Sequence, residues 1–258
     1  MSEGTLLTDV KGVYFDLDDT LCAYWDAARE GLRKTFEALC SDLGTPAKVI
    51  GHWATEFRAF CPTLKGTDWY GTYLQQGEPC RTELMRLVLL RFGIDDPARA
   101  RILGDRYAEE RDKTLRLFDD AVELLENLHG TFPIGLITNG PADVQRQEIA
   151  TLKLERYCDH IFIEGEMGRG KPHVEVFRQA QAAVGLEPHQ ILFVGNSYGH
   201  DIAPAINAGW RTAWIRRRSD VPPSAEGENP KPESLPVGAH EPDLTIGSLS
   251  ELIPLLSP

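Results

Sequence analysis

The chain has 258 residues, of which 42% are hydrophobic and 26% are charged. This composition is typical of a globular protein and excludes a wholly disordered or collagen-like chain. The length allows one domain of the α/β kind, or one domain that carries a second, smaller one. The formal net charge of −12 disfavours general binding to nucleic acid or to anionic membranes. We find no run approaching the ~20 apolar residues of a membrane span. No basic N-terminal cluster precedes an apolar run, so we expect a cytoplasmic protein.

Six short apolar runs predict β-strands, and segments with helical periodicity separate the later ones. The runs lie at residues 12–17, 132–138, 160–164, 190–195, 211–215 and 243–246. Runs that are apolar on both faces suit a parallel sheet covered by helices. Apolar residues three or four positions apart predict helices at 174–184, at 202–206 and around Val144, whose helix has Pro141 in its first turn. Because strand and helix alternate from residue 132 onward, we predict βαβ units.

The interval from Cys22 to Leu117 differs, because it contains no convincing strand. Four segments in it have the apolar periodicity of helices, at residues 32–43, 49–60, 84–92 and 103–114. Four such helices can pack on one another, so we predict a helical-bundle domain inserted after the first strand. The domains would be an α/β core, residues 1–21 and 118–258, and the insert, residues 22–117. Residues 218–242 are rich in Pro, Gly, Ser and Glu and predict a long exposed loop.

Polar residues gather where the predicted strands end, which is where parallel sheets bind their ligands. The sequence there reads Asp16-Leu17-Asp18-Asp19-Thr20, Thr138-Asn139-Gly140, Gly170-Lys171-Pro172 and Gly195-Asn196-Ser197, followed by Asp201. Asp16 and Asp18 lie two positions apart at a strand end, so their side chains point the same way. Two carboxylates that face one space repel each other, and a divalent cation offsets that repulsion. Mg²⁺ favours such oxygen ligands.

In this order, and across nearly the whole chain, the four motifs resemble the haloacid dehalogenase superfamily of hydrolases. The helical insert resembles the C1 cap of that family. The resemblance implies a doubly wound, Rossmann-like parallel sheet and a Mg²⁺-dependent phosphatase. It implies that Asp16 binds the metal with one oxygen and attacks phosphorus with the other. Asp18 would give its backbone carbonyl to the metal, while its side chain protonates the leaving oxygen and then deprotonates water.

The same resemblance assigns the remaining motif residues. Lys171 would neutralise the nucleophile and the transferring phosphoryl oxygens, which the Thr138 hydroxyl and the Asn139 amide would hold by hydrogen bonds. Asn196 and Asp201 would complete the metal site, directly or through water. Many family members have Asp where this chain has Asn196, and a neutral amide can still ligate Mg²⁺. We therefore expect weaker metal affinity and not a dead enzyme.

Structural explanations compete with several of these assignments. The DxD pair can form a solvated turn, Lys171 can face solvent, Thr138 can cap a turn and Asp201 can be the N-cap of the next helix. We interpret Trp53, Phe57 and Phe60, at helical spacing, as bundle core and not as a substrate platform. The Arg216-Arg217-Arg218 run is interpreted as a solvated strand end.

In C1-capped relatives the cap covers the site and selects the leaving group. Candidate selectors here are Tyr24, Trp25, Lys65, Trp69, Tyr70 and Tyr73. Their aromatic rings can stack on a nucleobase or a sugar. Length and cap layout look most like the subgroup of nucleotide 5′-monophosphatases and acylneuraminate-9-phosphate phosphatases. We therefore expect a small phosphomonoester of a nucleoside or sugar as substrate.

Three other functions remain open at this point. A 2-haloacid dehalogenase also uses an aspartate nucleophile, but its carbon substrate needs no leaving-group acid, so Asp18 favours phosphoryl transfer. A phosphomutase shares the cap and the site, and sequence does not report how long a phosphoenzyme survives. A binding protein with a relict site is favoured by Asn196 and opposed by the intact Asp16, Asp18, Thr138 and Lys171.

Overall fold

The computed structural model describes residues 7–220 and 234–256. In this part of the chain one parallel sheet has the strand order β3-β2-β1-β4-β5-β6. The strands are β1 Gly12–Phe15, β2 Ile134–Thr138, β3 His160–Ile163, β4 Ile191–Gly195, β5 Arg211–Ile215 and β6 Leu244–Ile246. All six lie where the apolar runs predicted them, and the doubly wound parallel sheet is confirmed. The first strand ends at Phe15 instead of residue 17, so Asp16 follows it directly.

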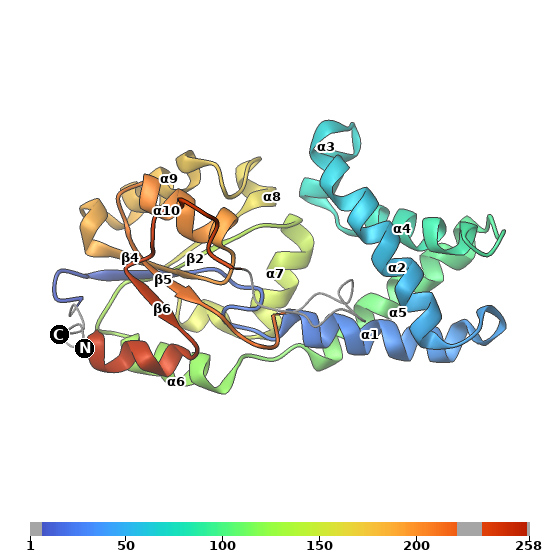
Figure 1. Ribbon diagram of the computed structural model, residues 1–258, viewed down its shortest axis with the longest axis horizontal. Coiled ribbons are helices and arrows are strands. Elements are labelled where there is room, and N and C mark those ends of the chain that lie inside the picture. The colour runs from blue at the N-terminus through green and yellow to red at the C-terminus, as the bar shows by residue number, and fades with distance from the viewer. Residues whose placement is uncertain (1–6, 221–233, 257–258) are drawn as a thin grey trace.

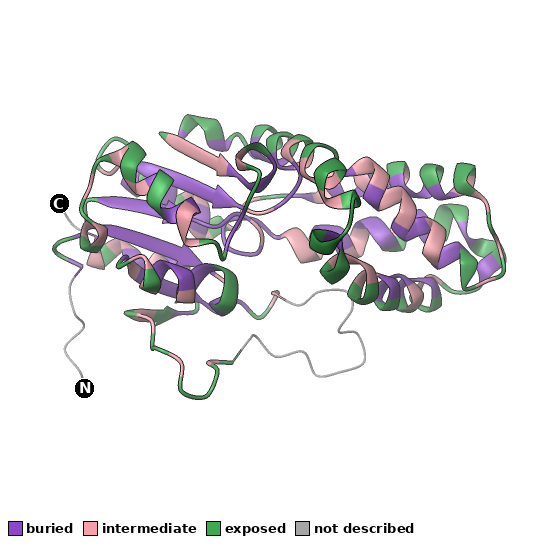
Figure 2. Cartoon of the chain, turned by 90° about the horizontal axis from the view of Figure 1, so that it is seen from above, coloured by how far each residue is buried: buried purple, intermediate pink, exposed green. Residues whose placement is uncertain are grey.

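Helices cover both faces of the sheet, as Figure 1 shows. On one face lie α6 (Asp119–Leu128), α7 (Ala142–Thr151) and the C-terminal helical segment Leu249–Leu255. On the other face lie α9 (Val174–Val184) and α10 (Ala203–Asn207). The side chains of β1 point alternately to the two faces of the sheet. Phe15 packs on the α6 side and Tyr14 on the α9 side. The strands are buried throughout much of their length (Figure 2).

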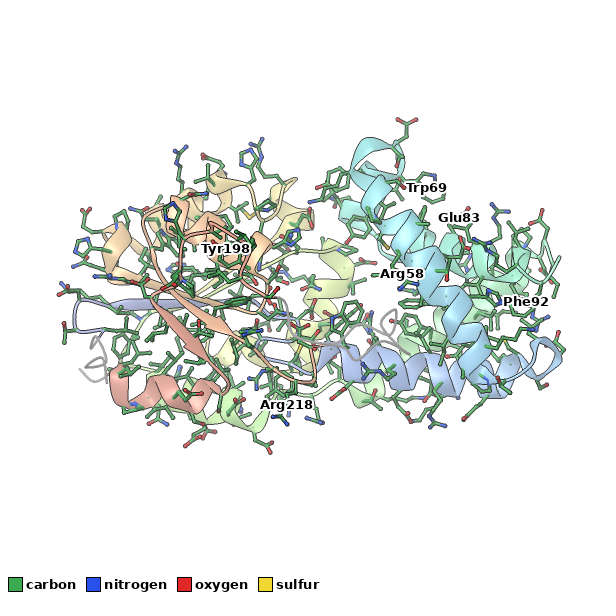
Figure 3. All side chains as sticks on the ribbon, viewed as in Figure 1. Arg58, Trp69, Glu83, Phe92, Tyr198 and Arg218 are labelled. Carbon is green, nitrogen blue, oxygen red and sulfur yellow. The ribbon has the colours of Figure 1, made fainter. Side chains whose placement is uncertain are left out.

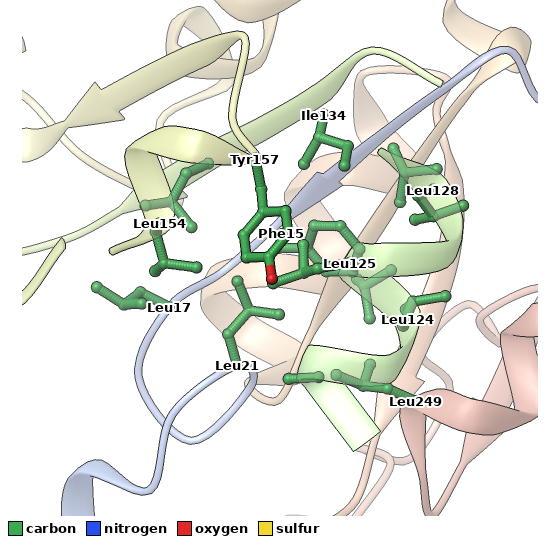
Figure 4. Close-up of a cluster of buried hydrophobic side chains, with 14 of the residues drawn as sticks. Phe15, Leu17, Leu21, Leu124, Leu125, Leu128, Ile134, Leu154, Tyr157 and Leu249 are labelled. Atoms are coloured by element: carbon green, nitrogen blue, oxygen red, sulfur yellow. The ribbon is translucent and has the colours of Figure 1, made fainter. Parts of the chain in front are cut away.

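The α6 side of the sheet holds the largest apolar cluster of the core. Leu124, Leu125 and Leu128 recur three or four positions apart on α6, so they share the helix face that packs against Phe15 (Figure 4). The sequence reasoning did not predict α6, although its leucines have the helical period. This packing fixes the segment from β1 to Leu17, and with it the position of Asp16.

The inserted segment contains five α-helices among the described residues: α1 Tyr24–Leu39, α2 Pro46–Phe60, α3 Trp69–Gln75, α4 Glu78–Leu90 and α5 Pro97–Thr114. Four of them correspond to the predicted helices, and α3 was not predicted. It buries none of its residues fully, so it has no apolar periodicity to detect. The first helix, predicted over residues 32–43, begins and ends earlier than expected, because α1 starts at Tyr24 and ends at Leu39, and Leu43 lies in a separate 3₁₀ turn.

The inserted helices have a core of their own, beside the sheet and not within it (Figure 1). Leu32, Phe36, Trp53 and Met85 are among its buried members. Trp53 is therefore core, as interpreted, while Phe57 and Phe60 are only partly buried against it. No helix in the described ranges is both long and apolar enough to cross a membrane.

The solvated strand end expected at residues 216–218 is wrong for Arg217, which is 8% exposed. Its guanidinium donates to both carboxylate oxygens of Asp120, at 3.0 and 2.8 Å, and to the carbonyl of Thr20. The predicted loop at 218–242 lies partly outside the described residues. Its described parts, 218–220 and 234–242, contain turns but no helix or strand.

Candidate active site

The carboxyl ends of β1, β2 and β4 meet at the edge of the sheet that faces the inserted helices. A cavity of about 460 Å³ lies there. The seven motif residues, together with Tyr24 and Trp25, line this catalytic cavity: Asp16, Asp18, Tyr24, Trp25, Thr138, Asn139, Lys171, Asn196 and Asp201. The motifs converge because parallel strands deliver their carboxyl ends to one edge.

Lys171 is the centre of the cluster, and it is 1% exposed. Its ammonium nitrogen lies 2.7 Å from Oδ1 of Asp16 and 2.6 Å from Oδ1 of Asp201. Burial lowers the pKa of Lys171, but the two carboxylates outweigh burial and the net shift is upward. Lys171 is therefore a buried cation between two acids and not a solvent-facing lysine.

The Asp16 carboxylate is buried and held at both oxygens. Oδ1 accepts from Lys171, and Oδ2 accepts from the Thr20 hydroxyl at 3.0 Å. Burial raises the pKa of Asp16 from 3.8 to about 6, which Lys171 partly opposes and Asp201 reinforces. Each carboxylate oxygen has a second lone pair, so Asp16 keeps the capacity to bind another partner.

Asp201 lies in the helical turn Tyr198–Ile202 that follows β4. Its Oδ2 accepts from the backbone N–H of Ser197 at 2.9 Å, so it fixes the start of this turn while its other oxygen reaches Lys171. Gly195 makes room for it, because a Cβ at that position would lie 2.5 Å from the Asp201 side chain. The expectation that Asp201 is the N-cap of the next helix is wrong, because Ile202 is the N-cap of α10 and Asp201 lies within the preceding turn. Asp201 instead stabilises that turn from inside while it takes part in the cluster.

Asp18 lies in the same cavity, and its surroundings include residues that sequence reasoning missed. The Gln145 amide donates to Asp18 at 3.4 Å and to Glu148 at 2.9 Å, while the Thr138 hydroxyl donates to Gln145 at 2.6 Å. Burial, and secondly the charge of Asp16, raises the pKa of Asp18 from 3.8 to about 7. Gln145 and Glu148 are buried polar positions one turn apart on α7, which no sequence motif marks.

Asn139 contacts Lys171 through its side chain. Its Nδ2 donates to the Lys171 carbonyl at 2.7 Å, and its Oδ1 accepts from the Lys171 N–H at 2.8 Å. This two-way bridge holds the Gly170–Lys171 segment against the end of β2. A Cβ at Gly170 would come within 2.3 Å of Asn139 Oδ1, so the glycine permits the bridge.

The oxygen donors of the site suit a hard divalent cation. No group of three or more His, Cys, Asp or Glu side chains within the described ranges is placed to hold a metal ion. The expected donor set needs only two carboxylates, since Asn196 offers an amide oxygen and Asp18 a main-chain carbonyl. Asp16 and Asp201 share a single ammonium group, which leaves excess negative charge in a buried place. Oxygen donors with excess negative charge fit Mg²⁺.

Asn196 is oriented by a neighbour that was not predicted. Its Nδ2 donates to Oδ2 of Asp220 at 2.8 Å. Its Oδ1 lies 3.4 Å from the Thr20 hydroxyl, which also binds Asp16. The bond to Asp220 therefore turns the amide oxygen of Asn196 toward the Asp16 side of the cavity.

Two of the contacts between the inserted helices and the core come from α3. The Tyr70 hydroxyl donates to Oε1 of Glu164 at 2.8 Å, and Gln75 donates to the Gly165 carbonyl at 3.0 Å. Glu164 is 3% exposed and also accepts from the backbone of Gly140. Trp69, a predicted selector at the start of α3, is 41% exposed and does not line the described cavities (Figure 3).

Comparison with protein families gives one match that spans most of the chain. The model of the haloacid dehalogenase-like hydrolases matches residues 10–209. A phosphoserine phosphatase of Thermus thermophilus is 32% identical over 80% of this chain and 76% of its own. An N-acylneuraminate-9-phosphatase of Mus musculus is 27% identical over 84% and 86%. A glyceraldehyde 3-phosphate phosphatase of Methanopyrus kandleri is 26% identical over 81% and 84%.

Solved structures agree on the fold over nearly the whole length. A HAD-hydrolase from Bacillus subtilis bound to magnesium matches with a TM-score of 0.67 and 22% identity, over 96% of this chain and 99% of the other. An L-2-haloacid dehalogenase from Xanthobacter autotrophicus matches with a TM-score of 0.68 and 20% identity, over 96% and 98%. The fold and the family match agree, and the chain belongs to the haloacid dehalogenase-like hydrolases, on their phosphatase branch.

Proposed function

We propose that the protein is a Mg²⁺-dependent phosphomonoester hydrolase that acts on a small phosphorylated metabolite through an aspartyl-phosphate at Asp16. The observation that carries the proposal is the position of Lys171, buried between Asp16 and Asp201 at the carboxyl ends of the strands. A buried cation beside a carboxylate is suited to neutralise a second anion that enters the same space. The phosphatase activity named for the relatives supports this assignment.

The chemistry divides between two acids. An Asp16 oxygen forms a bond to phosphorus, the bond from phosphorus to the ester oxygen breaks, and Asp18 gives its proton to that oxygen. Asp18 then takes a proton from water, whose oxygen attacks phosphorus and displaces Asp16. Asp18 lies in the same cavity as Asp16, which gives it access to the leaving oxygen.

Lys171 neutralises the negative charge of the phosphoryl group in both steps of the reaction. The Thr138 hydroxyl now donates a hydrogen bond to Gln145. It would donate to a phosphoryl oxygen instead when the substrate is bound. The Asn139 side chain supports the site by positioning Lys171. Mg²⁺, when bound by Asp16, Asp201, the amide oxygen of Asn196 and the carbonyl of Asp18, would supply positive charge to the phosphate oxygens.

We further propose that residues 22–117 act as a cap and residues 1–21 and 118–258 as the catalytic core. Tyr24, Trp25 and Tyr73 support this division, because these cap residues line the catalytic cavity together with core residues. The cap would exclude water from the reacting phosphorus and select the leaving group. A nucleotide or sugar phosphate, a cytoplasmic location and the absence of a nucleic-acid partner remain predictions.

The test measures phosphate release from 4-nitrophenyl phosphate and from a panel of nucleotide and sugar phosphates. The assays contain Mg²⁺ or EDTA, with Asp16→Asn as the blank. We expect release with Mg²⁺ and none with EDTA or in the blank. Chloride release from 2-chloropropionate without phosphate release would identify a dehalogenase. Isomerisation without free phosphate would identify a phosphomutase, and no reaction at all would identify a relict site.

A further inference from the structure

A second cavity, of about 360 Å³, opens beside the catalytic cavity and is walled by cap helices and core loops. We call it the cap cavity. The two cavities share Tyr24, Trp25 and Tyr73 as lining residues, among others, so they are contiguous. A phosphomonoester with its phosphate at Asp16 can therefore extend its alcohol part into the cap cavity. This volume is in the range of small-molecule pockets.

Aromatic rings make up much of the wall of the cap cavity. The Trp53 and Phe57 rings stack at 4.9 Å, and Trp25 meets Phe57 edge-on at 6.0 Å. Phe60, Leu64 and Leu84 add further apolar surface. A wall of this kind favours a flat or apolar body and gains little from a polyhydroxylated one.

Two donors in this wall lack hydrogen-bond partners within the described part of the chain. They are Nε1 of Trp53 and Nε of Arg81, and both atoms are buried. A buried donor left without an acceptor is destabilising, because it has given up its hydrogen bond to water and gained none. Both residues line the cap cavity, on the neighbouring helices α2 and α4. An acceptor brought by a ligand would remove this cost.

The charges around the cavity favour an anionic acceptor at Arg81. Of the described Lys and Arg residues that line it, Lys65 pairs with Glu164 at 3.1 Å and Arg111 with Asp112 at 2.7 Å. The Arg81 guanidinium pairs with Asp105 at 3.9 Å, and that carboxylate is 54% exposed. Arg81 is thus the lining cation with the weakest pairing. Guanidinium and carboxylate groups match in charge and in geometry.

We propose that the substrate is the phosphomonoester of an aromatic or largely apolar alcohol that carries a carboxylate, which Arg81 and Trp53 bind in the cap cavity. This inference rests on the proposed phosphatase function, and its substrate class replaces the nucleoside or sugar phosphate expected from the sequence. The phosphate and the carboxylate would occupy opposite ends of the joined cavities. The aromatic wall between them would bind the body of the alcohol.

The test compares kcat/KM for aryl phosphates that differ at one group. The substrates are 4-(phosphonooxy)benzoate, 4-(phosphonooxy)phenylacetate and 3-[4-(phosphonooxy)phenyl]propionate, each beside its carboxamide, with ribose 5-phosphate as the polar comparison. We expect at least one acid to exceed its amide by about tenfold or more, since a charged hydrogen bond is worth about 1.5–3 kcal/mol. The same acid should exceed ribose 5-phosphate.

Variants assign the preference to the cap cavity. Arg81→Met keeps the apolar stem and removes the charge, and Trp53→Phe keeps a ring and removes the N–H donor. Each should lower kcat/KM for the preferred acid more than for its amide. The control is Arg101→Met, since Arg101 is a cap arginine, 68% exposed, that does not line the cavity. It should preserve the acid preference, and thermal unfolding checks that each variant folds.

Different results would overturn the carboxylate site and the phosphatase function. Acid and amide turned over equally in all three pairs, or a preference that survives in Arg81→Met, overturns the carboxylate site. If 4-nitrophenyl phosphate is still hydrolysed, the phosphatase assignment stands. If no ester releases phosphate above the Asp16→Asn blank, the phosphatase function itself is overturned.

Discussion

The ammonium nitrogen of Lys171 lies 2.7 Å from Oδ1 of Asp16, although the two residues are 155 positions apart in the sequence. Lys171 is 1% and Asp16 is 7% exposed. Removing one partner of a buried pair leaves an uncompensated charge. Lys171 also faces the position proposed for the transferring phosphoryl group, so the loss of its ammonium group should affect catalysis.

We predict that Lys171→Met lowers kcat for 4-nitrophenyl phosphate by about 10²–10³-fold, because it removes a donor to the developing charge. Phosphate release at saturating substrate measures the effect. Lys11→Met, at an exposed lysine of the α/β core domain, is the matched control and should leave kcat unchanged. A folded Lys171→Met enzyme with nearly full kcat would contradict the role of Lys171.

The contact between Tyr70 and Glu164 joins the inserted helices to the core. Tyr70→Phe removes the hydroxyl that donates to the buried Glu164 carboxylate. A hydrogen bond to a charged group is worth about 1.5–3 kcal/mol, so we predict that KM rises about tenfold or more as the closed arrangement is weakened. Initial rates over a range of 4-nitrophenyl phosphate concentrations measure KM. Trp69→Phe, at the exposed neighbour, should leave KM unchanged, and an equal effect of both variants would contradict the prediction.

Asn196 offers a neutral ligand where a carboxylate would add charge. We predict that Asn196→Asp binds Mg²⁺ more tightly, as measured by calorimetric titration of the purified protein. The new carboxylate would face Asp220, which now accepts from the Asn196 amide at 2.8 Å. The double variant Asn196→Asp with Asp220→Asn removes that repulsion and should bind more tightly still. Unchanged or weaker affinity in both variants would count against a metal-ligand role for this position.

Asp120 holds α6 to two other segments. It accepts from Arg217, from the Ser248 hydroxyl and from the backbone N–H of Leu249. We predict that Asp120→Asn lowers the free energy of unfolding by about 2–4 kcal/mol, with kcat retained. Urea unfolding at pH 7 measures the loss. Asp119→Asn, an exposed change in the same helical turn, should cost about 0.5 kcal/mol or less.

The pH dependence of this stability difference has a definite sign. Burial raises the pKa of Asp120, but the bonds from Arg217 and Leu249 outweigh burial and hold the pKa below 3.8. The stabilisation is therefore fully present above pH 3.8 and is lost as the pH falls through the folded-state pKa. Wild type and Asp120→Asn should converge in stability only in that acidic range, and convergence near neutral pH would contradict the assignment.

The sequence predicted the strands and the meeting of the site residues at one edge of the sheet, for a physical reason. Parallel strands that are apolar on both faces leave a strong signal, and they bring Asp16, Thr138 and Asn196 to one edge whatever the details of packing. Lys171 and Asp201 follow from the same geometry, because both lie in segments that follow strands at this edge. The inserted helices with buried faces were predicted on the same basis of periodicity.

Features that depend on a distant partner could not be predicted. Arg217 looks like its exposed neighbours until Asp120 and the Thr20 carbonyl are seen beside it. Glu164 follows a strand and has no motif, yet it joins the core to Tyr70. The side-chain donors of Trp53 and Arg81, which have no acceptor among the residues that the structure describes, can be recognised only once the cavity around them is known.

The central claim is a covalent bond between phosphorus and the side chain of Asp16. Rapid acid quenching of the enzyme with ³²P-labelled 4-nitrophenyl phosphate and Mg²⁺, followed by digestion and peptide mapping, tests it most directly. The account predicts label on the peptide that contains Asp16, released by hydroxylamine, and none in Asp16→Asn. Label on another side chain, or full turnover by Asp16→Asn, would contradict it.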